Sequence, residues 1–274
     1  MSWGLGSAFW NSTMSGSLPV SENEQPTETS SLNPGRLEGA TAATCGTDQQ
    51  AVANINTDDL IFDLQLVVDS FMECKKDDGQ LHMDGYLRAY SEINKFFQIL
   101  GSVFNFVAHD VQKKITILQC YRKGGAGDFY YSIQSMIEYE QEHNLISNKD
   151  RQSGSRTLLR LHRALEFIIG FLSELHKAPD DGGLGSVTSE VYSRTLAKFH
   201  GWVLAKTVGA VLLMMPTKQT IVDRVTQGSK QITGGDAAIR ARNESLMPKA
   251  IEVMTSVYNL TQKLYEDYEI LDLP

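Results

Sequence analysis

The chain has 274 residues, of which 42% are hydrophobic and 21% charged, and its formal net charge is −8. This composition is that of a globular protein with enough apolar material for one core. The negative charge disfavours nucleic-acid binding, because contact with a phosphate backbone needs a basic face.

The first part of the chain divides into a polar tail and a helical region. Residues 1–55 are rich in Ser, Thr, Asn, Gly and Glu and lack periodic hydrophobic residues, which predicts a disordered tail. From residue 56 onward we expect one domain, and its hydrophobic spacing is helical. Thr57 and Asp128 are the expected N-caps of the first and fourth helices. The helices expected in this half span 58–76, 83–99, 102–122 and 128–145.

The second half continues the helical pattern to residue 274. It starts with a densely apolar helix, followed by a Pro- and Gly-rich break at 179–185. The helices expected in this half span 155–177, 187–215, 217–227 and 236–269. Pro248 should kink the last of these or split it in two. No alternating strand pattern occurs, so the predicted fold class is all-α with about eight helices.

Membrane, secretion and metal signals are weak throughout the sequence. No apolar run reaches the ~18–20 residues of a membrane span, and the N-terminal segment lacks the basic and apolar regions of a secretory signal. Cys45, Cys74 and Cys120 form neither a CxxC pair nor a Cys/His metal spacing. Reduced thiols in the cytosol are the simplest interpretation. We therefore expect a cytosolic protein with no metal ion and no cofactor.

Two charged pairs stand at i, i+4 within apolar helical segments: Asp110 with Lys114, and Arg156 with Arg160. Residues so spaced share one helix face, so two helices can bring one carboxylate and three cations together. Such a cluster at the rim of an apolar core suits a phosphate joined to an apolar group. The alternative is an ordinary solvated face, which is the common role of such residues.

His200 lies in an apolar segment and has two interpretations. A lone histidine there is more often a hydrogen-bonded core residue than a ligand. An enzyme could use His200 as a base oriented by Asp110. No nucleophile motif, glycine-rich phosphate loop or metal set supports that second interpretation.

Six segments carry a resemblance to a known family. They are LGSVF (100–104), DVQKKI (110–115), SGSRTLLRLHRAL (153–165), FHGW (199–202), VYNLTQKLY (257–265) and LDLP (271–274). On these segments, the chain from about residue 57 onward resembles the glycolipid transfer protein superfamily, in particular its ceramide-1-phosphate branch. The resemblance implies an all-α two-layer sandwich that encloses the chains of a lipid between its layers.

The resemblance also implies roles for individual residues. Asp110 would bind the sphingoid amide N–H and His200 the acyl-amide carbonyl, while Lys114, Arg156 and Arg160 would hold a phosphate. In the glycolipid-binding branch, an asparagine and a tryptophan occupy the positions of Lys114 and Arg160. The resemblance therefore implies a phosphate headgroup in preference to a sugar.

An apolar sleeve for the lipid chains is the last expected part of the site. The same residues would otherwise be ordinary core. They are Phe62, Leu66, Phe104, Leu161, Leu165, Trp202 and Val208.

The expected function is non-enzymatic transfer of a phosphate-headgroup sphingolipid, ceramide-1-phosphate, between membranes with transient surface contact. A lipid sensor that transfers little and a glycosphingolipid carrier are the alternatives. The sequence leaves the oligomeric state open.

Overall fold

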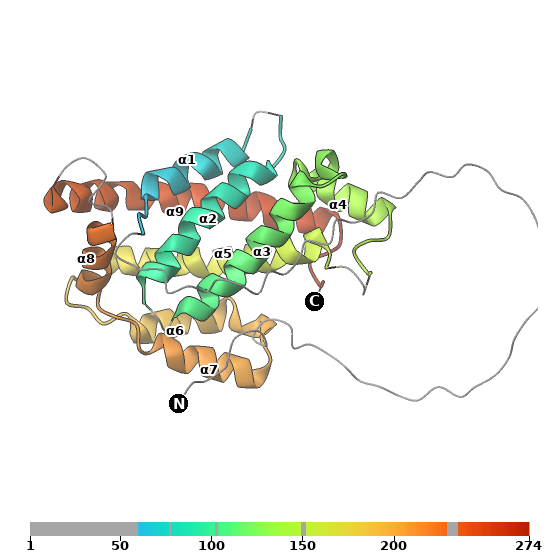
Figure 1. Ribbon diagram of the computed structural model, residues 1–274. Coiled ribbons are helices and arrows are strands. Elements are labelled where there is room, and N and C mark those ends of the chain that lie inside the picture. Colours follow the sequence, from blue (N-terminus) through green and yellow to red (C-terminus); the bar gives the residue numbers. More distant parts are fainter. Residues whose placement is uncertain (1–59, 77, 102–103, 149–151, 229–234, 274) are drawn as a thin grey trace, which may run out of the picture.

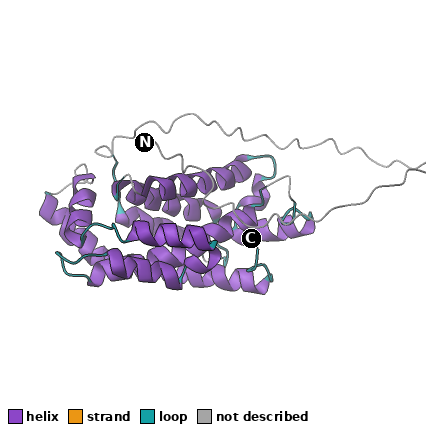
Figure 2. Cartoon of the chain, turned by 90° about the horizontal axis from the view of Figure 1, so that it is seen from below, coloured by secondary structure: helices purple, strands orange, loops and turns teal. Residues whose placement is uncertain are grey.

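The computed structural model describes residues 60–76, 78–101, 104–148, 152–228 and 235–273. All the named elements in these residues are helices, which confirms the predicted all-α class (Figure 1, Figure 2). The predicted tail and the predicted N-cap Thr57 lie outside the described residues.

Two layers of helices enclose one core (Figure 1). In the first layer α2 packs between α1 and α3, and in the second α5 packs between α9 and α6. The layers meet where α1 contacts α9 and α3 contacts α5, and α7 packs on α6. The first-layer helices and the short elements that follow are α1 (Leu64–Cys74), α2 (Met83–Ile99), α3 (Asn105–Lys123), the 3-10 helix η3 (Gly127–Tyr130) and α4 (Ile133–Glu142). The remaining elements are α5 (Gly154–Lys177), α6 (Gly185–Arg194), the 3-10 helix η4 (Ala197–Phe199), α7 (Trp202–Leu212), α8 (Lys218–Gly228) and α9 (Asp236–Asp267).

Close packing in the first layer depends on a glycine. A Cβ atom on Gly85 would lie 2.7 Å from the backbone nitrogen of Cys74, so only glycine lets α1 and α2 approach this closely. Helix α1 starts later than expected, because Asp63 accepts a hydrogen bond from the Gln65 N–H and caps it there. At the end of α2, Gly101 has a φ of +114°, a conformation that favours glycine.

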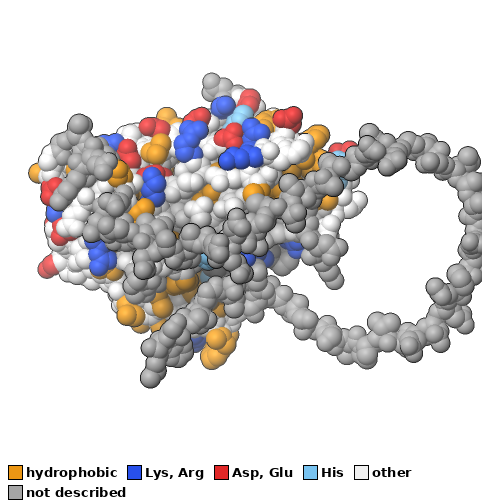
Figure 3. All heavy atoms as spheres, in the orientation of Figure 1, with side chains coloured by type: hydrophobic (Ala, Val, Ile, Leu, Met, Phe, Trp, Pro, Cys, Tyr) orange, Lys and Arg blue, Asp and Glu red, His pale blue; other side chains and the backbone are white. Residues whose placement is uncertain are grey.

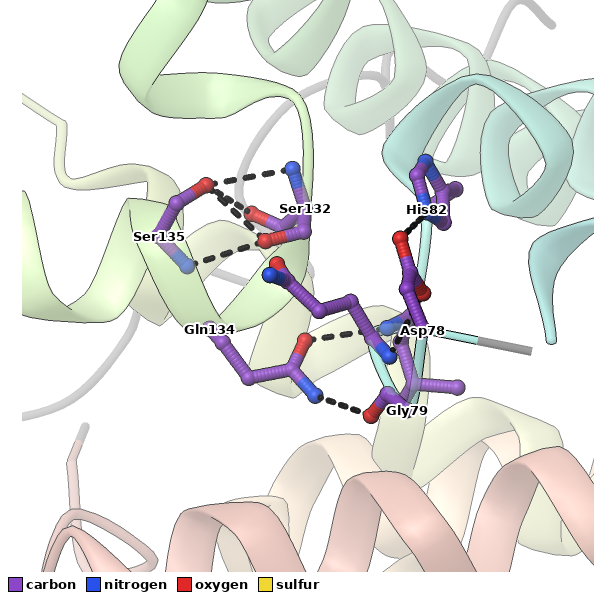
Figure 4. A network of polar contacts seen from close by, with 8 residues as sticks. Asp78, Gly79, His82, Ser132, Gln134 and Ser135 are labelled. Carbon is purple, nitrogen blue, oxygen red and sulfur yellow. Dashed lines mark hydrogen bonds and ion pairs between the residues drawn. The ribbon is translucent and has the colours of Figure 1, made fainter. Parts of the chain in front are cut away.

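The predicted helix 128–145 is wrong at its start, since Asp128 belongs to η3 and Ser132 caps α4. The Ser132 hydroxyl accepts the Ser135 N–H at 3.0 Å, and the Ser135 hydroxyl accepts the Ser132 N–H at 3.2 Å (Figure 4). The neighbouring Gln134 donates to the Gly79 carbonyl and accepts the Leu81 N–H. These bonds fix the start of α4 against the loop between α1 and α2.

The predicted helix 187–215 is interrupted. Helix α6 ends at Arg194, η4 follows, and His200 is extended with φ −109° and ψ 142°. Gly201 then precedes α7 as its N-cap residue. The apolar spacing continues across this break, which is why the sequence predicts one helix. Pro248 does not split the last helix, since α9 runs from Asp236 to Asp267, so of the two predicted effects of this proline the split does not occur.

The cysteines do not all match the expected reduced state. Cys74 is a free thiol, and burial raises its pKa to about 12. Cys120 is disulfide-bonded, which corrects the expectation for that residue. No group of His, Cys, Asp and Glu side chains among the described residues is arranged to hold a metal ion.

Candidate functional site

Helix α3 contributes a buried ion pair to the predicted cluster. The Lys114 ammonium group donates to both carboxylate oxygens of Asp110, at 2.6 Å and 2.5 Å. Only 5% of the Lys114 side chain and 17% of the Asp110 side chain are exposed. The two residues share a helix face, as their i, i+4 spacing predicts, and this face is turned to the protein interior and not to solvent.

Helix α5 brings two guanidinium groups to the same place. Ser153 caps this helix by accepting the Arg156 N–H, and Arg156 and Arg160 are half-buried one turn apart. Arg156 donates to the Asn148 carbonyl at 3.0 Å. Arg160 interacts electrostatically with both Asp110 and Arg156. The structure thus brings Arg160 to the pair of Asp110 and Lys114, and Arg156 lies beside Arg160, one turn earlier on α5.

His200 joins the cluster from the connection between η4 and α7. Its Nδ1 atom lies 2.5 Å from the hydroxyl of Tyr192, and its Nε2 atom is shielded from solvent. Burial and the nearby Lys114 cation lower the pKa of His200 to about 4. The imidazole is therefore neutral at pH 7 and has one N–H donor and one acceptor nitrogen.

Burial is the largest influence on the pKa values of both members of the ion pair, Asp110 and Lys114. It raises the pKa of Asp110 against the opposing effects of Lys114, Arg160 and Lys113. It also lowers the pKa of Lys114 in spite of the adjacent carboxylate. Charge in this cluster is incompletely solvated, so a ligand with hydrogen-bonding and anionic groups would improve its environment.

Glu140 on α4 supports the cluster and was missed by the sequence analysis. Its buried carboxylate accepts hydrogen bonds from the N–H groups of Gly154 and Ser155, at 2.7 Å and 2.9 Å, and from the hydroxyl groups of Ser153 and Tyr130. Glu140 therefore supplies acceptors for backbone N–H groups in the first turn of α5, the turn that carries Arg156. The sequence does contain an indication that Glu140 is buried, because it follows the apolar Met136 by four residues and therefore lies on the same helix face.

Arg163 was also missed, and it ties three segments together. Its guanidinium donates to the carbonyl groups of Leu271 and Leu273 at 2.7 Å and 2.9 Å. The same group lies 4.1 Å from the ring centroid of Phe199 in η4. Helix α5, the end of the chain and the connection that carries His200 are joined at this residue.

The seven residues expected to line an apolar sleeve fall into three groups. Phe62, Phe104, Leu161 and Leu165 are buried in the core, and Leu66 and Val208 are half-buried. Trp202 lies at the surface with 75% of its area exposed, so the structure does not place it in an interior pocket.

A cavity of about 430 Å³ lies between α1, α2, α5, α8 and α9. Phe62, Phe96 and Leu172 are among its apolar lining residues, and His176, Lys218 and Glu244 are among the polar ones. Its lining begins on α5 at Ile168, eight residues beyond Arg160, which is about 12 Å along the helix. The cavity and the cation cluster therefore occupy different stretches of the same helix.

An apolar surface patch surrounds the start and end of α7. We define the α7 patch as Trp202, Val203, Leu213 and Met214, whose exposed fractions range from 60% to 75%. Figure 3 shows hydrophobic side chains along the lower edge of the molecule, where Figure 1 places α6 and α7. In the part of the chain that the structure describes, no helix combines the length and apolar character needed to cross a membrane.

Comparison with known proteins identifies the family. The family described as Glycolipid transfer protein (GLTP) matches residues 81–227. Ceramide-1-phosphate transfer protein of Rattus norvegicus is 32% identical over 219 residues, which cover 78% of this chain and 97% of the rat protein. The chain belongs to the glycolipid transfer protein family. Ceramide-1-phosphate transfer protein of Homo sapiens is 30% identical over 217 residues, 78% of this chain and 97% of that protein.

Solved structures agree with this membership in the glycolipid transfer protein family. The apo form of mouse ceramide-1-phosphate transfer protein matches with a TM-score of 0.70 and 30% identity, over 78% of this chain and all of that one. The human protein in complex with 12:0 ceramide-1-phosphate matches with a TM-score of 0.67 and 29% identity, over the same shares. The two-layer helical sandwich expected from the resemblance is therefore the family fold.

Proposed function

We propose that the protein is a non-enzymatic carrier that moves ceramide-1-phosphate between membranes. The main support for this proposal is the cluster that Lys114, Arg156 and Arg160 form with Asp110. Three cations and one carboxylate leave a surplus of two positive charges. A phosphate monoester carries roughly −1.5 to −2 charges at pH 7. The related rat and human proteins named for ceramide-1-phosphate transfer support the same headgroup.

The ceramide amide is the second group that the site is proposed to recognise. An ionised carboxylate offers about four lone-pair sites, so Asp110 can accept an amide N–H while it keeps Lys114. His200 can donate one ring N–H to the acyl carbonyl. A lipid with both an amide and a phosphate therefore uses the anion, the cations and the imidazole together.

The apolar chains account for the need for a carrier. Exposing a methylene group to water costs ~0.8 kcal/mol, so a sixteen-carbon chain costs about 12 kcal/mol. The cavity beside Phe62 and Leu172 lies along α5 from the cluster and has a volume within the range of ligand pockets, roughly 300–1,000 Å³. We propose that the chains occupy this cavity and separate the neighbouring core residues Leu161 and Leu165.

The α7 patch is proposed to make the transient contact with membranes. Trp202 is suited to this role, because its ring is apolar and its N–H is polar, a combination that favours the membrane interface. The patch begins two residues after His200, so membrane contact and lipid recognition would occur close together.

The test is vesicle-to-vesicle transfer of fluorescent ceramide-1-phosphate beside a glucosylceramide with matched chains. We expect the wild-type protein to transfer the phosphate lipid faster, and Arg160→Leu to remove most of that transfer. Lys177→Leu is the matched control, because it removes a cation from the exposed far end of α5. Preferential transfer of glucosylceramide, or equal effects of the two substitutions, would contradict the proposed headgroup.

A further inference from the structure

The hydroxyl group of Tyr192 is connected to the candidate site through its hydrogen bond with His200. Tyr192 lies in α6, eight residues before the histidine, and 2% of its area is exposed. Its hydroxyl oxygen lies 2.5 Å from His200 Nδ1, and among the described residues this is the one hydrogen bond that the hydroxyl makes. The Phe167 ring packs edge-on against the tyrosine ring, at 6.2 Å between centroids and 87° between planes. The position of the hydroxyl is therefore fixed by packing.

The direction of this hydrogen bond follows from the surroundings of the hydroxyl. If Tyr192 accepted a proton from Nδ1–H, its own buried hydroxyl hydrogen would have no acceptor, which is costly. If Tyr192 donates instead, both atoms are satisfied and Nδ1 must be unprotonated. A neutral imidazole carries its single hydrogen on one nitrogen. The hydrogen of His200 then resides on Nε2.

From this geometry we propose that Tyr192 is a positioning residue that fixes His200 as the Nε2–H tautomer and so makes it a donor to the lipid carbonyl. This inference rests on the proposed function for the identity of the ligand. The opposite tautomer would make Nε2 an acceptor, which suits the nearby Lys114 and not a carbonyl. The backbone supports the same arrangement, because the His200 N–H donates to the Ala197 carbonyl at 3.0 Å and holds the main chain.

The first measurement uses the full chain without lipid and does not depend on the proposed function. Long-range 1H–15N NMR spectra of the histidine ring should show Nε2–H for His200 at neutral pH. In Tyr192→Phe, which removes one oxygen atom and keeps the ring, an Nδ1–H population should appear. An Nδ1–H tautomer in the wild-type protein would overturn the inference.

The second measurement compares two phosphate lipids with the same chain lengths. One is ceramide-1-phosphate, and the other is a dialkyl-ether glycerol phosphate, which has two chains and no carbonyl. Tyr192→Phe should lower the preference for ceramide-1-phosphate by about two- to ten-fold, the usual worth of one neutral hydrogen bond. Tyr268→Phe is the matched control, because it removes a hydroxyl that bonds Glu138 at the surface.

A double substitution separates positioning from a structural role. In a His200→Ala background, adding Tyr192→Phe should leave the ratio of the two affinities unchanged, because the hydroxyl acts through the imidazole. A further fall in that ratio, or an equal loss of both lipids in Tyr192→Phe alone, would overturn the positioning role. If the wild-type protein binds neither phosphate lipid, the proposed function fails, while the NMR spectra still decide the tautomer.

Discussion

Lys114 and Asp110 form an ion pair of 2.5 Å and 2.6 Å that is almost closed to solvent. Lys114→Met would leave the Asp110 carboxylate buried without its strongest partner. We expect a loss of about 3–5 kcal/mol in the free energy of unfolding, as for other buried pairs from which one partner is removed. Urea denaturation measures this change.

Two further variants check the interpretation of this ion pair. Asp110→Asn combined with Lys114→Met should recover part of the loss, since no charge is then left buried. Lys263→Met removes the exposed i, i+4 partner of Asp267 and should cause no measurable change. An effect of Lys114→Met as small as that of Lys263→Met would show that the ion pair adds nothing to the fold.

His162 should make stability depend on pH. Its ring lies 4.4 Å from that of Tyr258, its Nε2 atom lies 2.8 Å from the Gln262 oxygen, and burial lowers its pKa from 6.5 to about 4. The unfolded chain therefore binds the extra proton between about pH 6.5 and pH 4, and the folded chain does not. Stability is fully present above pH 6.5 and falls as the pH drops toward 4, by about 3 kcal/mol for this group.

Urea denaturation at several pH values tests this dependence. In His162→Phe, which keeps an aromatic ring beside Tyr258, the dependence of the unfolding free energy on pH should weaken in this window. If the unfolding free energy of His162→Phe changes with pH as steeply as that of the wild-type protein, His162 is not the source of the pH dependence.

Glu140 should be required for the start of α5. Glu140→Gln replaces one carboxylate oxygen by an NH₂ group that faces donors, among them Ser153 and the Ser155 N–H. We expect a loss of about 2–3 kcal/mol in unfolding free energy, in keeping with hydrogen bonds to a charged group. Glu142→Gln, at the exposed end of the same helix, is the control and should have little effect. Equal stability of the two variants would refute this role.

Trp202 should matter for membrane contact and not for the fold. With 75% of its area exposed, Trp202→Ala removes little packing, so thermal unfolding should be nearly unchanged. Binding to phosphatidylcholine vesicles should fall at least several-fold in a sedimentation assay. Leu260→Ala, which removes an exposed apolar side chain from α9, is the control. Loss of vesicle binding in both variants alike would mean that the α7 patch is not the contact surface.

The sequence predicts those helices best whose ends have clear local signals. The expected helices 83–99 and 155–177 agree with α2 and α5 to within one residue, because a glycine or proline follows each one closely. The break before α7 was not predictable, since the apolar spacing of Val203 and its neighbours continues that of α6. Spacing also cannot distinguish a buried Trp202 from an exposed one, because a surface patch and a core face have the same periodicity.

The neighbours within each helix of the candidate site were predictable from the sequence, and the contacts between distant segments were not. The i, i+4 rule placed Asp110 beside Lys114, and Arg156 beside Arg160, before the helices were known to meet. The contact between Tyr192 and His200 depends on how the chain turns at η4, and no local pattern reports that turn. The contacts of Arg163 were likewise not predictable from a local pattern, since its carbonyl partners Leu271 and Leu273 lie more than 100 residues away along the chain.

The short distance between His200 and Trp202 limits how a lipid can enter the proposed carrier. Two residues of extended chain span at most about 7 Å. The headgroup region on each side of a bilayer is about 5–7 Å thick. When the Trp202 backbone lies in that region, the His200 backbone lies within one headgroup layer of it. Under the proposed function, a ceramide amide would then meet the imidazole while both hydrocarbon chains are still in the bilayer, so the polar end of the lipid would be bound before the chains.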